Sequence, residues 1–213
     1  GCLAGVSGNG TINVYGGEGL GKSGGFIAMT SGGTINIEGG EWTANTDGTY
    51  ANGNKSVLVA QSDKQYNAGA GNSIVNVTGG TFKGGYNCYG NAVGDAQINI
   101  KGGNFNANPT SYVAEDYIAV EHNGVWNVVK AAAKIGEKAY ATLEEAFKAA
   151  TSGCTIDLKK DITVAKSISI NKLVTIDLNG KAISSAEGYV FEVTGGELVL
   201  QGEGSIGAIC YII

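Results

Sequence analysis

Two aspartates have the residue type and the spacing that catalysis could use. Asp157 and Asp177 each stand inside the phrase Thr-Ile-Asp-Leu, which occurs twice in the second half of the chain. If the two phrases are neighbouring strands, the carboxyl groups stack about 5 Å apart, which is the separation of the nucleophile and the general acid in retaining glycosidases. The alternative is an outward-facing ladder, in which the aspartates take the place that Asn13 and Asn36 take earlier in the chain. We favour the ladder.

Other residues that support catalysis or metal binding are sparse. His122 is the only histidine and falls in an expected turn, so a Ser-His-Asp triad has little support. The four cysteines, Cys2, Cys88, Cys154 and Cys210, lack the close spacing of structural zinc sites and are expected to be buried free thiols. We therefore predict no catalytic residue, no metal, no cofactor and no enzymatic activity. A polysaccharide lyase or hydrolase, such as a phage-tail or surface depolymerase, is the alternative.

Four tyrosines could bind carbohydrate by offering ring faces for stacking. Tyr50 and Tyr66 stand in polar segments, and Tyr86 and Tyr89 follow later in the chain. The other interpretation, which we favour, is that these rings cover the side of the fold. Glycan binding is therefore the second candidate function.

The charge pattern argues against polyanionic partners. The chain has a net charge of −5, and its 14 basic residues are all lysine. Arginine supplies the bidentate fork that phosphate recognition favours, so its absence and the acidic balance argue against nucleic acid as a partner. No apolar run reaches the roughly 18 residues of a membrane helix, and we expect no membrane insertion.

The elements that must position these residues follow from one repeated phrase. It reads aliphatic, Asn, aliphatic, variable, Gly, Gly and occurs at residues 12–17, 35–40, 75–80 and 98–103. This alternation is typical of a β-strand with aliphatic side chains on one face and Asn on the other, and the Gly pair then permits a turn. A short strand with one apolar face cannot bury that face alone. The repeat therefore predicts coils that stack on one another.

The spacing of the phrase defines the length of a coil. Its first aliphatic residues are Ile12, Ile35, Val75 and Ile98, so the first and third intervals are equal and the second is much longer. We interpret the long interval as one coil of ordinary length with an insertion in two polar loops, near 46–54 and 62–72. Inserted loops on a coiled scaffold often mark a binding face.

Each coil is predicted to contain two further strands. One lies between successive phrases, at residues 26–29, at 57–60 and, more weakly, at 91–93. The other follows the Gly pair. Its aromatic residues, Trp42, Phe82 and Phe105, fall at matching positions.

The pattern changes after residue 105. Two alternating strands flank the dipeptide Asn123-Gly124, which is the strongest short-range signal of a β-hairpin. We expect this hairpin to close the first stack of coils and cover its edge strands.

One helix is predicted after the hairpin. Thr142 and Glu145 have the spacing of a capping box, an apolar stripe follows, and Gly153 ends the helix. We expect it to cap a second stack of coils. In that stack the inward pairs are Ile156 and Leu158, then Ile176 and Leu178, then Leu198 and Leu200, each pair about one coil length after the last.

These features resemble the right-handed parallel β-helix of the pectate-lyase-like family. The phrase Gly-Gly-Thr-Phe and the segments 140–150, 155–163 and 174–181 are also similar to repetitive surface proteins of Gram-positive gut bacteria. The resemblance implies a right-handed parallel β-helix (β-solenoid) with three strands per coil of about 20–25 residues. Together with the β-hairpin and the one short capping α-helix expected from the residues, this gives an all-β fold class. It also implies an extracellular or cell-surface location.

Four parts are expected along the chain. They are β-helix coils at 1–105, a closing turn and β-hairpin at 106–130, a linker and capping helix at 131–153, and β-helix coils at 154–213 that could continue into residue 1 of another copy.

The two ends of the sequence are expected to form a seam. Both are apolar where a strand of a coil should lie, and the interval from Leu198 to the Ile12 of a following copy would be close to one coil. A longer tandem-repeat polypeptide, a circular arrangement and completion by a neighbouring subunit all fit, and in the last two Cys2 could bridge Cys210. The seam residues are Cys2, Leu3, Val6, Ile209, Cys210, Tyr211, Ile212 and Ile213. We hypothesise a structural or adhesive protein that stacks head to tail with copies of itself, with carbohydrate as the alternative partner.

Overall fold

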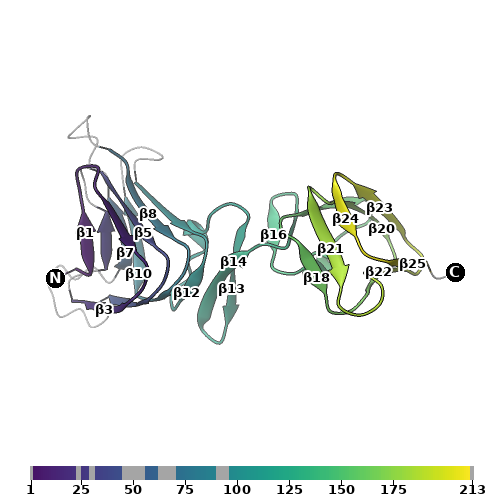
Figure 1. The fold of residues 1–213 in the computed structure, drawn as a ribbon, viewed down its shortest axis with the longest axis horizontal. Coiled ribbons are helices and arrows are strands. Elements are labelled where there is room, and N and C mark those ends of the chain that lie inside the picture. The colour runs from purple at the N-terminus through teal and green to yellow at the C-terminus, as the bar shows by residue number, and fades with distance from the viewer. Residues whose placement is uncertain are drawn as a thin grey trace. The chain divides into compact units, whose positions relative to one another are not determined.

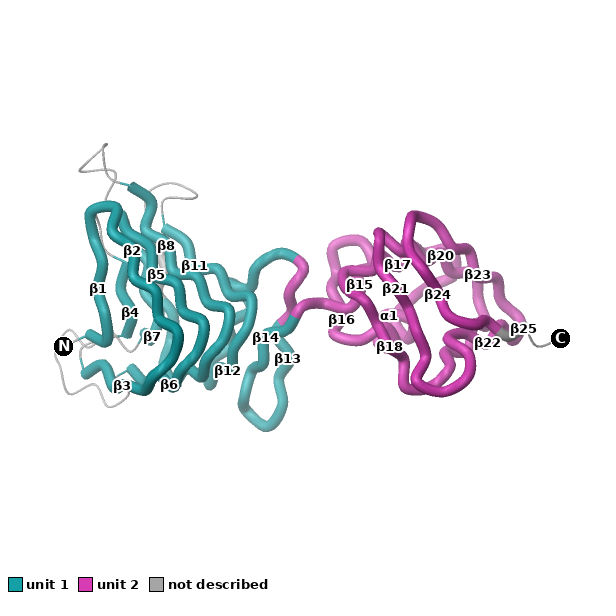
Figure 2. Tube along the Cα trace, in the orientation of Figure 1, with its two compact units in different colours: residues 1–115, 119–129 teal, residues 116–118, 130–213 magenta. Residues whose placement is uncertain are grey.

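The computed structural model describes residues 2–22, 25–28, 32–44, 56–61, 71–89 and 96–211, without the side chains of 87–89 and 210–211. The chain forms two compact units. Unit 1 contains residues 1–115 and 119–129, and unit 2 contains residues 116–118 and 130–213 (Figure 2). Each unit is a parallel β-solenoid in which every coil contributes one strand to each of three sheets (Figure 1).

Unit 1 consists of four coils. Its first sheet contains β1 (Ala4–Val6), β4 (Phe26–Ala28), β7 (Ser56–Gln61) and β10 (Gly85–Tyr89). Its second sheet contains β2 (Thr11–Val14), β5 (Gly33–Ile37), β8 (Ser73–Val77) and β11 (Ala96–Ile100). Its third sheet contains β3 (Glu18–Gly21), β6 (Glu41–Ala44), β9 (Thr81–Lys83) and β12 (Gly103–Phe105). The coil strands pair in parallel, as stacked coils require.

The repeated phrase forms the second sheet of unit 1 in one continuous register. Asn36 pairs with Asn13 on one side and with Asn76 on the other, and Asn99 pairs with Asn76. The long interval is therefore one coil with insertions, which lie mostly in the undescribed residues 45–55 and 62–70. The aliphatic side chains beside the asparagines are half-buried in the first coil and buried in the other three, as predicted. In the second to fourth coils they are Ile35, Ile37, Val75, Val77, Ile98 and Ile100.

The two positions of the Gly pair require glycine for different structural reasons. The second glycine has φ between 101° and 114° in all four copies, a conformation that favours Gly. The first glycine lies against the preceding coil: a Cβ at Gly102 would lie 2.2 Å from the carbonyl oxygen of Thr78, and a Cβ at Gly79 would lie 2.3 Å from that of Glu38. A Cβ at Gly16, in the first coil, would meet no atom within 4 Å. The Gly pair thus turns the chain and also lets the coils approach closely.

A column of aromatic side chains fills the inner face of the third sheet. Phe82 pairs in register with Trp42 and with Phe105, as the matching positions predicted. The rings of Phe82 and Phe105 are stacked, with centroids 5.0 Å apart and planes 11° apart. The indole of Trp42 makes an edge contact with Phe26, and its Nε1 donates a hydrogen bond to the carbonyl oxygen of Gly39 (2.8 Å). The aromatic residues are therefore buried coil against coil.

The predicted hairpin consists of β13 (Tyr117–His122) and β14 (Val125–Lys130). Asn123 and Gly124 both have positive φ, 51° and 79°, as a type I′ turn requires. Strand β14 pairs antiparallel with β12 and so covers the edge of the third sheet. The edge of the second sheet is covered by a different segment. A 3-10 turn, η1 (Thr110–Tyr112), leads into Val113, which forms a β-bridge with Ile100 of β11.

Unit 2 consists of three coils. Its largest sheet has the order β16 (Lys138–Tyr140), β15 (Ala133–Ile135), β17 (Cys154–Leu158), β20 (Leu173–Asp177) and β23 (Glu197–Gln201). The second sheet contains β18 (Ile162–Val164), β21 (Lys181–Ser185) and β24 (Gly204–Ile206). The third sheet contains β19 (Ile168–Ile170), β22 (Phe191–Val193) and β25 (Ile209–Tyr211). The coil strands are parallel, whereas β15 pairs antiparallel with both β16 and β17.

The predicted helix is α1 (Leu143–Ala149), which packs on the core of unit 2. Its capping box forms: Thr142 Oγ1 accepts a hydrogen bond from the backbone N–H of Glu145, and Glu145 Oε2 accepts one from the N–H of Ala141, both at 3.2 Å. The apolar stripe of the helix is buried together with the aliphatic residues of the coils. The predicted fold class, a β-solenoid with three strands per coil, a hairpin and a capping helix, is confirmed.

One strand of unit 1 was predicted in the wrong place. The third-interval strand, expected at residues 91–93, is β10 at Gly85–Tyr89, and residues 91–93 lie outside the described part of the chain. Only Gly84 separates β9 from β10, so the chain turns there without the longer loop that the prediction assumed. Strand β10 also contains tyrosine and cysteine in place of the aliphatic residues that mark β4 and β7 in the same sheet.

The register of the last coil also differs from the prediction. Leu198 pairs with Val174 and Leu200 with Ile176, whereas the predicted spacing aligned Leu198 with Ile176. The two registers differ by two residues, so the same side chains point inward in both. The alternation of apolar and polar residues alone could therefore not distinguish them. A Cβ at Gly196 would lie 2.2 Å from the backbone nitrogen of Lys172. This close approach is compatible with glycine alone and holds the observed register.

Alanine substitutions at two equivalent glycines test the stacking role of the Gly pair. We expect Gly102→Ala to lower the free energy of unfolding of unit 1 by about 1–3 kcal/mol, because the added methyl overlaps the Thr78 carbonyl. Gly16→Ala is the matched control and is expected to change it by less than about 0.5 kcal/mol. Trp42 and Trp126 both belong to unit 1, so tryptophan fluorescence during urea unfolding reports this unit. Equal stability of the two variants would contradict the stacking role.

Candidate functional site

Asp157 and Asp177 lie side by side on β17 and β20, as the sequence predicted. Both are half-buried. Asp177 accepts a hydrogen bond at Oδ1 from the backbone N–H of Asn179 and another at Oδ2 from Nε2 of Gln201, each at 3.0 Å. These bonds hold the turn after β20 and join β20 to the next coil. The geometry therefore favours a structural ladder over an acid and nucleophile pair.

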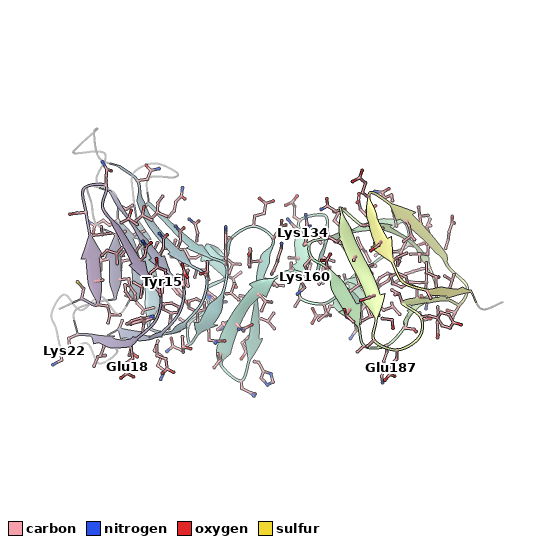
Figure 3. The ribbon with its side chains drawn as sticks, viewed as in Figure 1. Tyr15, Glu18, Lys22, Lys134, Lys160 and Glu187 are labelled. Atoms are coloured by element: carbon pink, nitrogen blue, oxygen red, sulfur yellow. The ribbon has the colours of Figure 1, made fainter. Side chains whose placement is uncertain are left out.

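The aspartate pair belongs to a longer column of polar residues. Lys134 pairs with Asp157 at one end, and Gln201 pairs with Asp177 at the other. Lys134 Nζ also lies 4.0 Å from Asp116 Oδ1, and Lys159 Nζ lies 3.4 Å from the same oxygen. Figure 3 labels Lys134. Lys134 and Lys159 therefore place positive charge beside the carboxylate of Asp116.

Unit 1 has an asparagine ladder, which we define as Asn13, Asn36, Asn76 and Asn99. Asn36 Nδ2 donates to Asn13 Oδ1 (2.9 Å), Asn76 Nδ2 to Asn36 Oδ1 (2.9 Å), and Asn99 Nδ2 to Asn76 Oδ1 (3.0 Å). Each inner amide thus donates to one coil and accepts from the other. Sequence reasoning predicted the outward direction of these residues but not the hydrogen-bonded chain. The signal was the identical position of Asn in all four phrases.

Hydroxyl groups make similar coil-to-coil bonds in unit 2. Thr163 Oγ1 and Ser184 Oγ lie 2.9 Å apart on β18 and β21. Ser169 Oγ and Thr194 Oγ1 lie 2.9 Å apart beside β19 and β22. Outward polar side chains are therefore used to join coils in both units.

The tyrosine candidates for glycan stacking are only partly described. Tyr50 and Tyr66 lie outside the described residues, and of Tyr89 only the backbone is described, in β10. Tyr86 donates a hydrogen bond from its hydroxyl to the carbonyl oxygen of Ala107 (2.8 Å). Its ring packs against Tyr112 with centroids 5.3 Å apart, and also against Phe105. Tyr86 therefore covers the side of the coil, and glycan binding by the other three stays a prediction.

The described seam residues lie in the outermost described coil of each unit. Leu3 and Val6 are half-buried, and Cys2 is exposed with a free thiol, against the prediction that the cysteines are buried. Ile209 is 39% exposed. The side chains of Cys210 and Tyr211 and all of Ile212 and Ile213 lie outside the description. The other described free thiol, Cys154, is half-buried.

Three grooves surround α1 within unit 2, and sequence reasoning missed all of them. The first, which we call the β19 groove, has a volume of about 530 Å³ and is lined by Glu144, Phe147, Lys148, residues 165–172 and Val174. A second, also about 530 Å³, is lined by Ile118, Lys138, Ala139, Tyr140, Glu145, Lys148 and Ala149. A third of about 440 Å³ lies between the start of α1 and β18. They are missed because a groove depends on how α1 sits on the coil, which periodicity does not encode.

Across the described ranges, no group of three or more His, Cys, Asp or Glu side chains is arranged to hold a metal ion. Within those ranges, no helix combines the length and the apolar character needed to cross a bilayer.

Comparison of the chain with protein-family models, with curated proteins and with solved structures finds no match.

The half-buried, hydrogen-bonded Tyr86 predicts a specific dependence of stability on pH. Burial and, secondarily, Tyr112 raise the pKa of Tyr86 in the folded protein. The unfolded tyrosine, with a pKa of about 10, ionises first, so the contribution of Tyr86 is full below pH 10 and is lost as the pH rises beyond it. We expect Tyr86→Phe to cost about 1 kcal/mol at pH 7, and this cost to shrink between pH 9 and pH 11.

Urea unfolding followed by tryptophan fluorescence at several pH values measures this difference. Tyr15→Phe is the control, because Tyr15 is 72% exposed (labelled in Figure 3) and its substitution should have little effect at any pH. A cost of Tyr86→Phe that stays constant up to pH 11 would contradict the half-buried, hydrogen-bonded phenol.

Proposed function

We propose that this chain is a non-enzymatic structural or adhesive β-solenoid that acts at the cell surface or outside the cell. The observation that carries the proposal is the use of outward polar side chains to join coils. The asparagine ladder links all four coils of unit 1, and the Asp177 carboxylate links β20 to Gln201 in unit 2. The ladder asparagines and Asp177, which face outward and could have contacted a ligand, are engaged within the scaffold.

Such a scaffold suits a mechanical or spacing role. Each added coil extends the three sheets and completes the backbone hydrogen bonds of the coil before it, so length increases with little new sequence information. The side-chain ladders add one bond per coil, worth about 1 kcal/mol each. We expect each stack of coils to be stiff along its own axis.

The location is supported by the resemblance of the repeats to surface proteins. The three-stranded coils resemble those of pectate-lyase-like β-helices, and the Gly-Gly phrases are similar to repetitive surface proteins of Gram-positive gut bacteria. These surface proteins are extracellular, and we extend that location to this chain as part of the proposal.

Stacking with further coils is supported by apolar residues at the outer coil of unit 2. Leu200 and Ile209 are 37% and 39% exposed, although their partners in the preceding coil, Ile176 and Phe191, are fully buried. Both side chains occupy inward positions, so a further coil with the same pattern would bury them. We propose that coils of a second copy of this chain do so, head to tail.

Size-exclusion chromatography with multi-angle light scattering tests the stacking. We expect the molar mass of the native chain to increase with concentration, and the double variant Leu200→Lys, Ile209→Lys to stay a monomer, because two charges at the outer coil oppose contact with an apolar surface. Leu173→Lys is the matched control, since Leu173 is 38% exposed but lies on the outward face of β20, and it should still associate. A monomeric native chain at every concentration would contradict stacking between copies.

A further inference from the structure

The first coil of unit 2 leaves two strand edges beside α1. Strand β17 is covered by β15, whereas β18 and β19 are the outermost strands of their sheets in the described part of the chain. The helix does not complete these edges, because its backbone groups are engaged along its own axis. Free strand edges of this kind are templates for pairing with another extended chain.

The β19 groove follows one of these edges along its whole length. Its lining contains β19, the residues on both sides of that strand, and the facing side of α1. Phe147, Ile168, Ile170 and Val174 form an apolar floor and are each at most 8% exposed. The groove therefore combines a strand edge with apolar surface, and it lies wholly within unit 2.

The hydrogen bonds of β19 identify the backbone groups that face the groove. The N–H of Ile168 donates to the carbonyl oxygen of Val190 (3.0 Å), and the N–H of Thr194 donates to that of Ile170 (2.9 Å). Ile168 and Ile170 thus direct their backbone groups toward β22. Successive residues of a strand direct these groups to opposite sides, so the N–H and C=O of Ser169 point to the groove. The Ser169 hydroxyl is engaged separately, with Thr194 Oγ1.

The rim of the groove is positively charged although the chain as a whole is acidic. Lys148, Lys166 and Lys172 line it, and Glu144 is the single acidic residue in the lining. Lys172 Nζ donates a hydrogen bond to the carbonyl oxygen of Ala150 (2.6 Å), which joins the end of α1 to the coil. Lys148 and Lys166 are exposed. The local charge therefore favours a negatively charged occupant.

We propose that the β19 groove binds an acidic peptide in extended conformation, which adds as a strand to the free edge of β19. The backbone of the peptide would bond the N–H and C=O of Ser169, alternate side chains would pack on Phe147 and its neighbours, and the acidic side chains would face Lys148 and Lys166. A further solenoid coil is a poor fit here, because α1 already buries the core at this end of unit 2. The site is independent of the stacking proposed above, which uses the opposite edge of the unit 2 sheets.

Peptide binding to the full chain tests the proposal directly. The probe is a fluorescein-labelled, end-capped heptapeptide of sequence Thr-Glu-Val-Glu-Val-Glu-Thr, followed by fluorescence anisotropy at about 50 mM salt, where charge attraction is weakly screened. A lysine version, Thr-Lys-Val-Lys-Val-Lys-Thr, tests the charge preference, and an acidic version with proline as its central residue tests the strand geometry. We expect saturable binding of the first peptide, and at least about tenfold weaker binding of the other two. No saturation by the acidic peptide up to about 1 mM, or equal binding of the lysine peptide, would overturn the proposal.

Variants at the groove separate backbone pairing from charge. Ser169→Pro removes the N–H that faces the groove and leaves the bonds to β22, and an edge strand tolerates proline at such a position. Ser169→Ala is its matched control, since it removes the hydroxyl and keeps the N–H. We expect about fivefold to tenfold weaker binding for Ser169→Pro, less than twofold change for Ser169→Ala, and about fivefold weaker binding for Lys166→Glu. Lys181→Glu, outside the groove, controls for net charge and should bind within about twofold of the native chain.

Hydrogen exchange gives a measurement that needs no variant. Peptide addition at an acidic or neutral pH should slow exchange of the Ser169 amide at least about tenfold, and leave the amide of Ile168, already bonded to Val190, nearly unchanged. Binding without protection of the Ser169 amide would overturn strand addition even if Ser169→Pro fails to fold.

Discussion

The close contact between the Gly-Gly corner of one coil and the backbone of the coil before it is the constraint on which unit 1 depends. A Cβ at Gly102 or Gly79 would lie 2.2 or 2.3 Å from the carbonyl oxygen of the preceding coil, so side chains are excluded there and the corners must nest. Once the corners nest, every later position is fixed in register. Aliphatic residues then lie over aliphatic residues and Phe82 over Phe105, so the side chains of the core pack in this one register.

The same register determines what the outward side chains can do. Identical residues in neighbouring strands are brought to hydrogen-bonding distance, and an amide can both donate and accept, so Asn13, Asn36, Asn76 and Asn99 form one chain. Carboxylates cannot form such a chain with each other because neither donates when ionised. In unit 2 the two adjacent aspartates have donors on their outer sides: Asp177 accepts from Gln201, and Asp157 pairs in register with Lys134. The ladders are therefore consequences of stacking, and they favour a scaffold role over catalysis.

The sequence predicts those features of the fold that depend on local chemistry and on the alternation of apolar and polar residues. The coils, the inward aliphatic residues, the Asn-Gly turn and the Thr142 cap all follow from residues close together in the sequence. The predictions failed where two arrangements satisfy the same alternation, as at Leu198, or where a strand lacks aliphatic residues, as in β10. The packing of Tyr86 on Tyr112 and the β19 groove depend on contacts between distant segments, which no local pattern contains.

The central claim, that outward side chains join the coils in register, is tested most directly by nuclear magnetic resonance of the asparagine side-chain amides. With asparagine labelled by nitrogen-15, the claim predicts slowly exchanging side-chain amide protons for Asn36, Asn76 and Asn99, and cross-relaxation peaks that link each to the next member of the ladder. Exchange as fast as that of a free asparagine side chain, with no peaks between consecutive members, would contradict it.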